Sequence, residues 1–308
     1  MRGALVLSAL RTTAPEGNAA REGIGETRSL TGRVGEDRRR TPLRNDDAGS
    51  GSRTALGTTI RRGALDRPRG PLPTRVQDLD PLPDSYHRAV DTGLAELGLR
   101  LAAEARRAID DHVRLLLAWT AAINLTAIRE PEAAARLHVL DSLAAVPVLR
   151  QRGIDRFLDL GSGGGYPGLP LAAALPADAL LVEAVGKKAR FLEVAATAAG
   201  LADQVDVAAL RAEQLARDPA HAGRWPIVTA RAVAALPRLV ELALPLLEPG
   251  GALVAWKRGD LRGEIEAARP VVRALGANAP EVLPVAVTGL GQHCLVIVER
   301  RHRAGHGA

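Results

Sequence analysis

The stretch best suited to chemistry is a glycine-rich loop, FLDLGSGGGYPGLPLAA, at residues 157–173. Glycine lets the backbone take positive φ angles and lets a ligand lie close against it. Gly161, Gly163 and Gly165 form GxGxG directly after an apolar run. Gly163, Gly165 and Gly168 form an overlapping motif that begins two residues later, the GxGxxG that is typical of dinucleotide domains. The loop therefore predicts a nucleotide-like cofactor, either a nicotinamide dinucleotide or an adenosine-based methyl donor.

Tyr166 and the proline after it favour the methyl donor. In a dinucleotide enzyme the pyrophosphate approaches the helix N-terminus at this point. A tyrosine ring blocks an anion there more readily than it blocks a compact amino-acid group. We therefore predict that Gly161, Gly163 and Gly165 bind the cofactor and that Tyr166 forms a wall beside it. Gly168 is interpreted only as the first residue of a helix.

The sequence around this loop alternates between strands and helices. We expect strands at 157–162, 180–185, 204–210, 226–233 and 251–257, and helices at 168–175, 187–201, 212–217, 236–247 and 261–275. Such alternation predicts a mainly parallel sheet with helices on both faces. Residues 281–290 and 293–301 predict two strands joined by a Gly-rich turn, which must pair antiparallel. The expected fold is α/β and Rossmann-like, with a seven-stranded, mostly parallel sheet, a C-terminal antiparallel hairpin and preceding N-terminal helices.

The terminal hairpin also bears on the cofactor. Dinucleotide domains usually complete their second half with parallel strands, whereas the common α/β methyltransferases that use S-adenosylmethionine end in an antiparallel strand. Glu183 ends the second predicted strand, where its carboxylate could accept hydrogen bonds from the ribose hydroxyls of either cofactor. The sequence therefore predicts a class I S-adenosylmethionine-dependent methyltransferase. The remaining alternative is an α/β domain that has lost its ligand.

Composition divides the 308-residue chain into four parts. Residues 1–83 are rich in Arg, Gly and Pro without periodicity, which predicts a disordered extension or a segment before the start codon used in the cell. Residues 84–152 predict a helical segment packed on the core, including a helix that opens at Pro131. We expect the methyltransferase domain at 153–301 and a flexible tail at 302–308.

The single cysteine suits a reducing compartment, and the sequence has no segment apolar enough to predict a membrane span. The net charge is +6, but residues 1–80 hold 15 of the 41 basic residues and 10 of the 35 acidic ones, so the rest is nearly neutral. With Cys294 as its one cysteine, the chain has no intrachain disulfide and no cysteine-based zinc site. No apolar run approaches the roughly 20 residues that span a bilayer. We expect a cytoplasmic monomer without a metal.

Several further motifs accompany the glycine loop. They are NLT at 124–126, RLHVLDS at 136–142, FLDLGSGGGYPG at 157–168, GKKARFL at 186–192, RAE at 211–213 and TARA at 229–232. Together, over roughly Leu94 to Arg300, the chain resembles the small-subunit ribosomal RNA methyltransferase G (RsmG/GidB) family. The resemblance implies methylation of N7 of a guanosine in the decoding-region loop of 16S rRNA, with S-adenosylmethionine as cofactor. The partner would be 16S rRNA, the 30S subunit or its assembly intermediate.

The resemblance also assigns roles to residues. It implies that Gly161 and Tyr166 line the cofactor site and that Ala212 and Glu213 hold the adenine end. Tyr166 departs from the usual aliphatic residue or Phe at its position. Arg231 would lie at the cofactor and target side of the fourth strand.

Other residues are expected around the target base. Asn124 belongs to a loop that we expect to form an active-site wall. His138 and Asp141 are neighbours on one helix face and are expected to form a target-side polar cluster with Arg136. The candidates for catalytic residues are thus Arg231, Asn124 and His138.

Four cations are candidates for RNA phosphate contacts. They are Arg136, Lys187, Lys188 and Arg190. The last three lie in the first turn of a predicted helix, where a positive charge opposes the helix dipole by a few tenths of a kcal/mol. A phosphate partner would explain that placement, and ordinary solvated side chains would explain it equally well.

The chemistry that is missing agrees with N7 methylation. Methylation of a pyrimidine C5 needs a cysteine nucleophile, and Cys294 is expected in the final strand, far from the ligand edge, as a small buried hydrophobe. Methylation of an adenine amine commonly uses Asn or Asp before Pro-Pro-aromatic, where this chain has TARAVAAL. Guanine N7 needs no strong base, so in-line attack on the methyl group would depend mostly on positioning. The alternatives are another RNA or small-molecule substrate, or an RNA-binding assembly protein with a vestigial fold.

Overall fold

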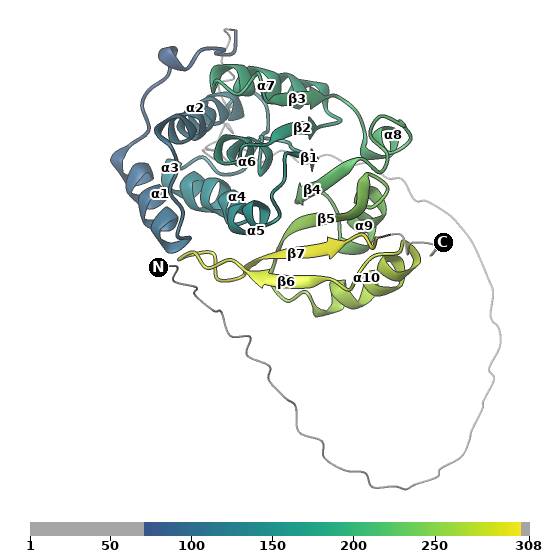
Figure 1. Ribbon diagram of the computed structural model, residues 1–308. Helices are drawn as coiled ribbons and strands as arrows, with labels where there is room; N and C mark the ends of the chain where they lie inside the picture. The colour runs from purple at the N-terminus through teal and green to yellow at the C-terminus, as the bar shows by residue number, and fades with distance from the viewer. Residues whose placement is uncertain (1–70, 303–308) are drawn as a thin grey trace, which may run out of the picture. The chain divides into compact units, whose positions relative to one another are not determined.

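The computed structural model describes residues 71–302, and its centre is a seven-stranded sheet. The strands are β1 (Arg156–Leu160), β2 (Asp178–Val182), β3 (Val205–Ala208), β4 (Trp225–Arg231), β5 (Leu247–Arg258), β6 (Glu281–Pro284) and β7 (His293–Glu299). They lie in the order β3-β2-β1-β4-β5-β7-β6 (Figure 1). Strands β1 to β5 are parallel and β7 pairs antiparallel with both β5 and β6. The predicted fold class and its terminal hairpin are confirmed.

The direction of β7 corrects the expectation for Cys294. Because β7 runs opposite to β5, its first residues lie at the carboxyl end of β5, where Cys294 pairs with Lys257. The prediction that Cys294 is far from the ligand edge is therefore wrong. The thiol is nevertheless buried, and burial followed by the charges of nearby carboxylates raises its pKa, which disfavours the nucleophilic thiolate.

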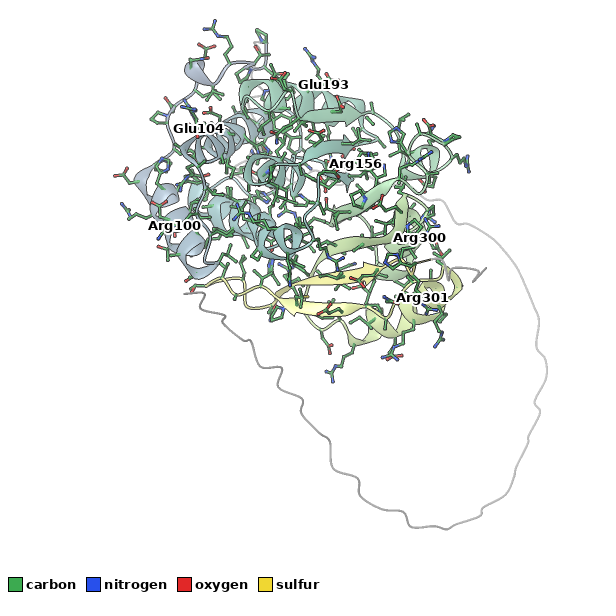
Figure 2. All side chains as sticks on the ribbon, in the orientation of Figure 1. Arg100, Glu104, Arg156, Glu193, Arg300 and Arg301 are labelled. Atoms are coloured by element: carbon green, nitrogen blue, oxygen red, sulfur yellow. The ribbon has the colours of Figure 1, made fainter. Side chains whose placement is uncertain are left out.

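Side chains along each strand alternate between two apolar layers. Phe157 and Leu181 face one layer, and Leu158 and Val182 face the other. The helices α6 (Gly168–Ala174) and α7 (Gly186–Ala198) lie with the N-terminal helices on the first face, and α8 (Ala212–Leu215), α9 (Leu236–Ala243) and α10 (Arg262–Ala274) lie on the second. Exposed charged residues such as Glu104, labelled in Figure 2, lie outside these layers. Within residues 71–302, no helix is long and apolar enough to span a membrane.

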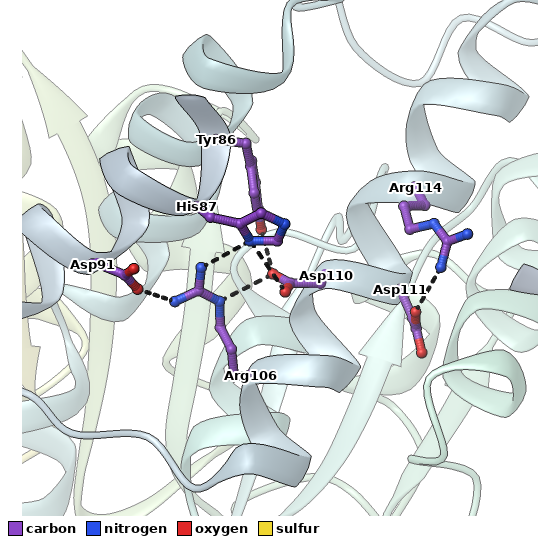
Figure 3. Close-up of polar contacts among 7 residues, drawn as sticks. All are labelled: Tyr86, His87, Asp91, Arg106, Asp110, Asp111 and Arg114. Atoms are coloured by element: carbon purple, nitrogen blue, oxygen red, sulfur yellow. Dashed lines mark hydrogen bonds and ion pairs between the residues drawn. The ribbon is translucent and has the colours of Figure 1, made fainter. Parts of the chain in front are cut away.

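Two N-terminal helices, α1 (Asp84–Glu96) and α2 (Ala103–Thr120), are tied together by a polar network (Figure 3). Arg106 of α2 donates hydrogen bonds to Asp91 of α1, at 2.6 Å, and to Asp110, at 3.2 Å. The Tyr86 hydroxyl of α1 donates to the same Asp110 at 2.9 Å, and burial is the main cause that raises its pKa. The break between the two helices includes Gly98, whose φ is +63°. These helices share one apolar cluster with the sheet.

The residues just before α1 differ from the expectation. Residues 71–83, which composition assigns to a disordered extension, pack against α2 through a 3-10 turn, η1 (Val76–Asp78). Trp119 donates its indole N–H to the Pro73 carbonyl at 2.7 Å, and Arg114 donates to the Val76 carbonyl at 2.9 Å. Side chains on α2 thus hold this segment through its backbone carbonyls, and the Val76 carbonyl also accepts from the Leu79 amide at 2.9 Å. The remaining residues of the predicted extension, 1–70, and 303–308 of the predicted tail lie outside the described residues.

The helix expected from Pro131 is divided into short pieces. They are α3 (Pro131–Ala134), a π-helical turn η2 (Ala135–Leu140), α4 (Asp141–Leu143) and α5 (Val146–Gln151). A π turn adds a residue to the helical repeat and is frequent at functional sites. Here it carries His138, and Asp141 follows it directly; both contact Arg231 at the end of β4.

Gly168 at the start of α6 is needed for close packing. A Cβ at this position would lie 2.3 Å from Leu181 Cδ2 and 2.8 Å from Asp159 Oδ2. Close helix–strand packing is the role of the third glycine in GxGxxG. The interpretation of Gly168 as merely the first helical residue is therefore incomplete, because α6 could not approach β1 and β2 so closely with a larger residue.

Replacing Gly168 with Ala should lower the free energy of unfolding by about 1–3 kcal/mol through overpacking. Urea denaturation measures the change. Gly263→Ala is the matched control, because Gly263 lies in α10 and no atom lies within 4 Å of the position that its Cβ would take. The control should be neutral or stabilising by up to about 1 kcal/mol. Equal stabilities for the two variants would contradict the packing argument.

Candidate active site

The cofactor loop follows β1 and is shaped by three glycines. Gly161, Gly163 and Gly165 have φ angles of +65°, +55° and +88°, which residues with a side chain rarely adopt. A Cβ on Gly165 would also lie 2.7 Å from His112 Nε2. The loop therefore forms a cradle that only glycine permits at these positions.

Glu183 follows β2 and closes one side of that cradle. Its Oε2 accepts a hydrogen bond from the Gly163 amide at 2.9 Å and its Oε1 accepts one from the Val185 amide at 2.8 Å. These bonds fix the carboxylate while each oxygen keeps a second lone pair for a hydroxyl donor. The cradle and the fixed carboxylate fit an adenosine-containing cofactor.

A cavity of about 590 Å³ extends from the cradle to the residues on η2 and β4. Of the predicted site residues, it is lined by Gly161, Gly163, Tyr166, His138, Arg231 and Lys188. The others do not line it: Gly165, Glu183, Ala212, Glu213, Asn124, Arg136, Lys187 and Arg190. The structure thus brings the loop and the polar cluster to one cavity, and the other predicted residues are not among those that line it.

Arg231 is the central charge of this cavity. Its side chain is 16% exposed, and Nη1 donates to Asp141 Oδ2 at 3.2 Å and to the Leu137 carbonyl at 3.0 Å. Asp141 is 3% exposed, so the pair is buried. The next residue, Ala232, has φ +56°, a conformation that costs a residue with a Cβ about 1–2 kcal/mol. Backbone strain of this kind clusters at functional sites.

His138 continues the network from Arg231 to Thr126. Arg231 Nη2 lies 3.2 Å from His138 Nδ1, and His138 Nε2 lies 2.7 Å from Thr126 Oγ1. Since arginine can only donate, Nδ1 must accept, and the ring hydrogen is assigned to Nε2. Burial, reinforced by the charge of Arg231, lowers the pKa of His138 to about 3. His138 is therefore a neutral ring that connects Arg231 to Thr126.

Tyr166 lies between two histidines. Its ring stacks on His138 at 4.6 Å and contacts His112 at 4.5 Å, with the Arg231 guanidinium 5.1 Å from the ring centroid. The ring is 4% exposed. Tyr166 is thus a rigid wall of the cavity.

Sequence reasoning missed His112, which lies on α2. Its Nε2 donates to the Gly164 carbonyl at 2.7 Å, and its Nδ1 is buried without a hydrogen-bond partner among residues 71–302. Burial, followed by the charge of Arg231, lowers its pKa to about 4. A single histidine on a helix carries no signal that it will support a loop 52 residues away.

His293 and Trp256 were also missed. His293 Nδ1 lies 3.0 Å from Asp141 Oδ1, and Trp256 donates its indole N–H to the Asp141 carbonyl at 2.6 Å. Arg231 and Trp256 are register partners on β4 and β5, which brings both to Asp141, directly after η2. The available signal was the antiparallel direction of the last strand, which places its first residue at the ligand edge.

Two predicted residues lie elsewhere. Glu213, on α8, forms a surface ion pair with Arg238 at 2.6 Å. Asn124 is exposed, while the neighbouring Leu125 and Thr126 line the cavity. The expected wall is thus formed by the loop without the Asn124 side chain.

The predicted RNA-binding cations differ in their surroundings. Lys187 is exposed and Lys188 half-buried at the start of α7, and within the described range neither has a carboxylate partner. Arg190 pairs with Glu193 at 3.1 Å, and Arg136 pairs with Glu132 at 3.4 Å. The two lysines are therefore the freer pair to meet a phosphate.

Sheet order and cradle together define the class of protein. Five parallel strands, an antiparallel β7 inserted between β5 and β6, and a glycine cradle after β1 make this a class I S-adenosylmethionine-dependent methyltransferase. Residues 105–288 match the family model described as GidB, rRNA small subunit methyltransferase G. The chain belongs to this family.

Two ribosomal RNA small subunit methyltransferases G agree with the family match. The chain is 37% identical over 210 residues to the ribosomal RNA small subunit methyltransferase G of Dehalococcoides mccartyi, covering 68% of this chain and 88% of the relative. It is 41% identical over 222 residues to the same enzyme of Stenotrophomonas maltophilia, covering 71% of this chain and 97% of the relative. A solved structure of the O-methyltransferase from Bacillus cereus in complex with SAH is 17% identical, with a TM-score of 0.47 over 69% of this chain and 97% of that one.

The buried histidines predict a pH dependence of stability. A folded-state pKa of about 4 for His112 lies below the ordinary 6.5, so the unfolded chain binds more protons between these values and stability falls as pH falls. As the pH falls from 6.5 to 4.5, His112 should lower the free energy of unfolding by about 2–3 kcal/mol. His112→Gln, which can still donate to Gly164, should lose that part of the slope in urea denaturation at several pH values.

Asp159→Asn supplies a control of opposite sign. Burial raises the pKa of Asp159 to about 6, so the folded state binds more protons between 3.8 and 6 and gains stability as pH falls. The Asp159→Asn variant should therefore lose free energy of unfolding more steeply than the wild type as the pH falls. Identical slopes for the wild type and His112→Gln would contradict the assignment.

Proposed function

We propose that this chain methylates N7 of a guanosine in the decoding-region loop of 16S rRNA, using S-adenosylmethionine, in the cytoplasm. The observation that carries the proposal is the single cavity that joins the glycine cradle to the polar cluster of Arg231 and His138. Cofactor and base can therefore meet without a separate channel. The family match and the names of the relatives support ribosomal RNA as the substrate class.

The residues of the chain bind and orient the reactants. S-adenosylmethionine, when bound, supplies an electrophilic methyl group. Gly161, Gly163 and Glu183 would hold its adenosine part, and Tyr166 would form a wall beside its methionine part. Because N7 of guanine has an available lone pair, no residue has to remove a proton before the reaction. Neutral His138 agrees with that requirement, and positioning is the main contribution of the protein.

Methylation at N7 makes the base cationic, so the charge of Arg231 affects the stability of the product in the cavity. An isolated arginine would repel that product. Here Asp141 accepts from the guanidinium at 3.2 Å, so the pair is close to neutral as seen from the cavity. Arg231 can therefore order the site through hydrogen bonds without strongly opposing the new charge.

The direct test incubates the protein with labelled S-adenosylmethionine and 16S rRNA from cells that lack the modification, both bare and as 30S particles. Label at guanine N7 is the expected result, and comparison of the two substrates shows which form is used. Label only on another RNA or a small molecule contradicts the substrate assignment. Binding of RNA without transfer would indicate an assembly protein with a vestigial cofactor site.

Glu183→Gln should weaken S-adenosylmethionine binding by about 10–100-fold, because a charge-assisted hydrogen bond to a ribose hydroxyl contributes about 1.5–3 kcal/mol. Isothermal titration calorimetry measures the affinity. Glu241→Gln is the matched control: Glu241 forms a surface ion pair with Arg238 and should bind the cofactor as the wild type does. Unchanged affinity in Glu183→Gln would remove Glu183 from the cofactor site.

Replacing Lys187, Lys188 and Arg190 together with Gln should weaken RNA binding and reduce the slope of log affinity against log salt by about 2–3. A filter-binding series over salt concentration measures the slope. The control removes three exposed arginines on α10, Arg262, Arg269 and Arg273, and should change the slope less. Equal slopes for the first variant and the wild type would refute the phosphate contacts.

A further inference from the structure

A polar chain around the cavity has a fixed hydrogen-bond direction at each step. It runs through Thr126, His138, Arg231, Asp141 and His293, with separations of 2.7, 3.2, 3.2 and 3.0 Å. Arginine can only donate, and a carboxylate can only accept. The central ion pair therefore determines whether each end of the chain donates or accepts.

At one end, Thr126 is left as a donor. Its Oγ1 accepts from His138 Nε2–H at 2.7 Å and from the Ile128 amide at 3.1 Å, which occupies both lone pairs. The hydroxyl hydrogen has no acceptor in the part of the chain that the structure describes. Because Thr126 lines the cavity, this hydrogen is available to a ligand there.

At the other end, His293 is left as an acceptor. Asp141 Oδ1 accepts from Nδ1, so in the neutral imidazole the lone pair is on Nε2. Nε2 has no hydrogen-bond partner within residues 71–302 and is not among their buried unpaired polar atoms. His293 lines the same cavity, where the cations Lys188 and Arg258 can only donate.

We propose that Thr126 and His293 read the Watson–Crick edge of the target base, Thr126 donating to O6 and His293 accepting from N1–H. Guanine presents this acceptor and donor at neighbouring positions, whereas adenine presents an amino donor and an N1 lone pair. Both purines have an N7, so N7 alone does not select guanine. The inference rests on the proposed function and adds to it the residues that choose the base.

The test compares two 16S rRNAs, prepared by ligation, that carry guanine or 2-aminopurine at the target position. 2-Aminopurine keeps N7 but lacks O6 and has a lone pair at N1. The measured quantity is the ratio of kcat/KM for methyl transfer to the two RNAs. In the wild type guanine should be preferred by roughly 100-fold or more, because the wrong edge leaves both protein groups unpaired.

The double variant Thr126→Val, His293→Asn should reduce that preference at least about tenfold. Asn can still donate to Asp141 from near the Nδ1 position but has no atom at Nε2. The matched controls Thr126→Ser and His293→Gln keep a hydroxyl and an acceptor near Nε2, and should retain most of the preference. A merely structural role would lower kcat/KM for both RNAs and leave the ratio unchanged.

A preference equal to that of the wild type in the double variant overturns the proposal. If the double variant fails to fold, as judged by circular dichroism and S-adenosylhomocysteine binding, the two single variants decide, each with an expected reduction of about threefold or more. Failure of the wild type to methylate the guanine RNA at all contradicts the proposed function and removes this inference with it. The two failures are therefore distinguishable.

Discussion

The buried ion pair between Arg231 and Asp141 is the interaction on which the site depends. Asp141 is 3% exposed, and removing one partner of such a pair leaves an uncompensated charge at a cost of about 3–5 kcal/mol. Its two partners come from β4 and from the segment that follows the π turn, 90 residues apart. The pair therefore joins the N-terminal helices to the sheet at the same point where it organises the cavity.

The surroundings of this pair explain why the site contains little acid–base chemistry. His112 and His138 flank Tyr166, and burial together with the charge of Arg231 keeps both imidazoles neutral down to about pH 4 and about pH 3. Neutral rings can stack closely and take part in hydrogen bonds without adding charge. For a reaction that creates a cation on the base, a rigid and nearly neutral pocket is the suitable environment.

The N-terminal helices contribute more than a cover. The His112 ring holds the Gly164 carbonyl, and the Thr126 hydroxyl extends the polar network, so the cofactor loop and the target side are both supported from the same helical layer. Arg106 and Arg114 fix α1 and the preceding residues on α2 through hydrogen bonds to side chains and carbonyls. The stability of this helical layer and the geometry of the site are consequently linked, because the same layer holds the cofactor loop and the polar network.

The sequence by itself determined the fold class, the cofactor loop and the convergence of His138 and Asp141, because strand and helix periodicity, glycine at positive φ and helical spacing are local properties. It did not determine the roles of His112, Trp256 and His293, nor the position of Cys294. These depend on which residues, far apart along the chain, meet when β7 inserts antiparallel beside β5 and the helices close on the sheet. Only the tertiary structure decides such contacts, since the local pattern predicts an antiparallel terminal pair but not which strand of the sheet β7 lies beside.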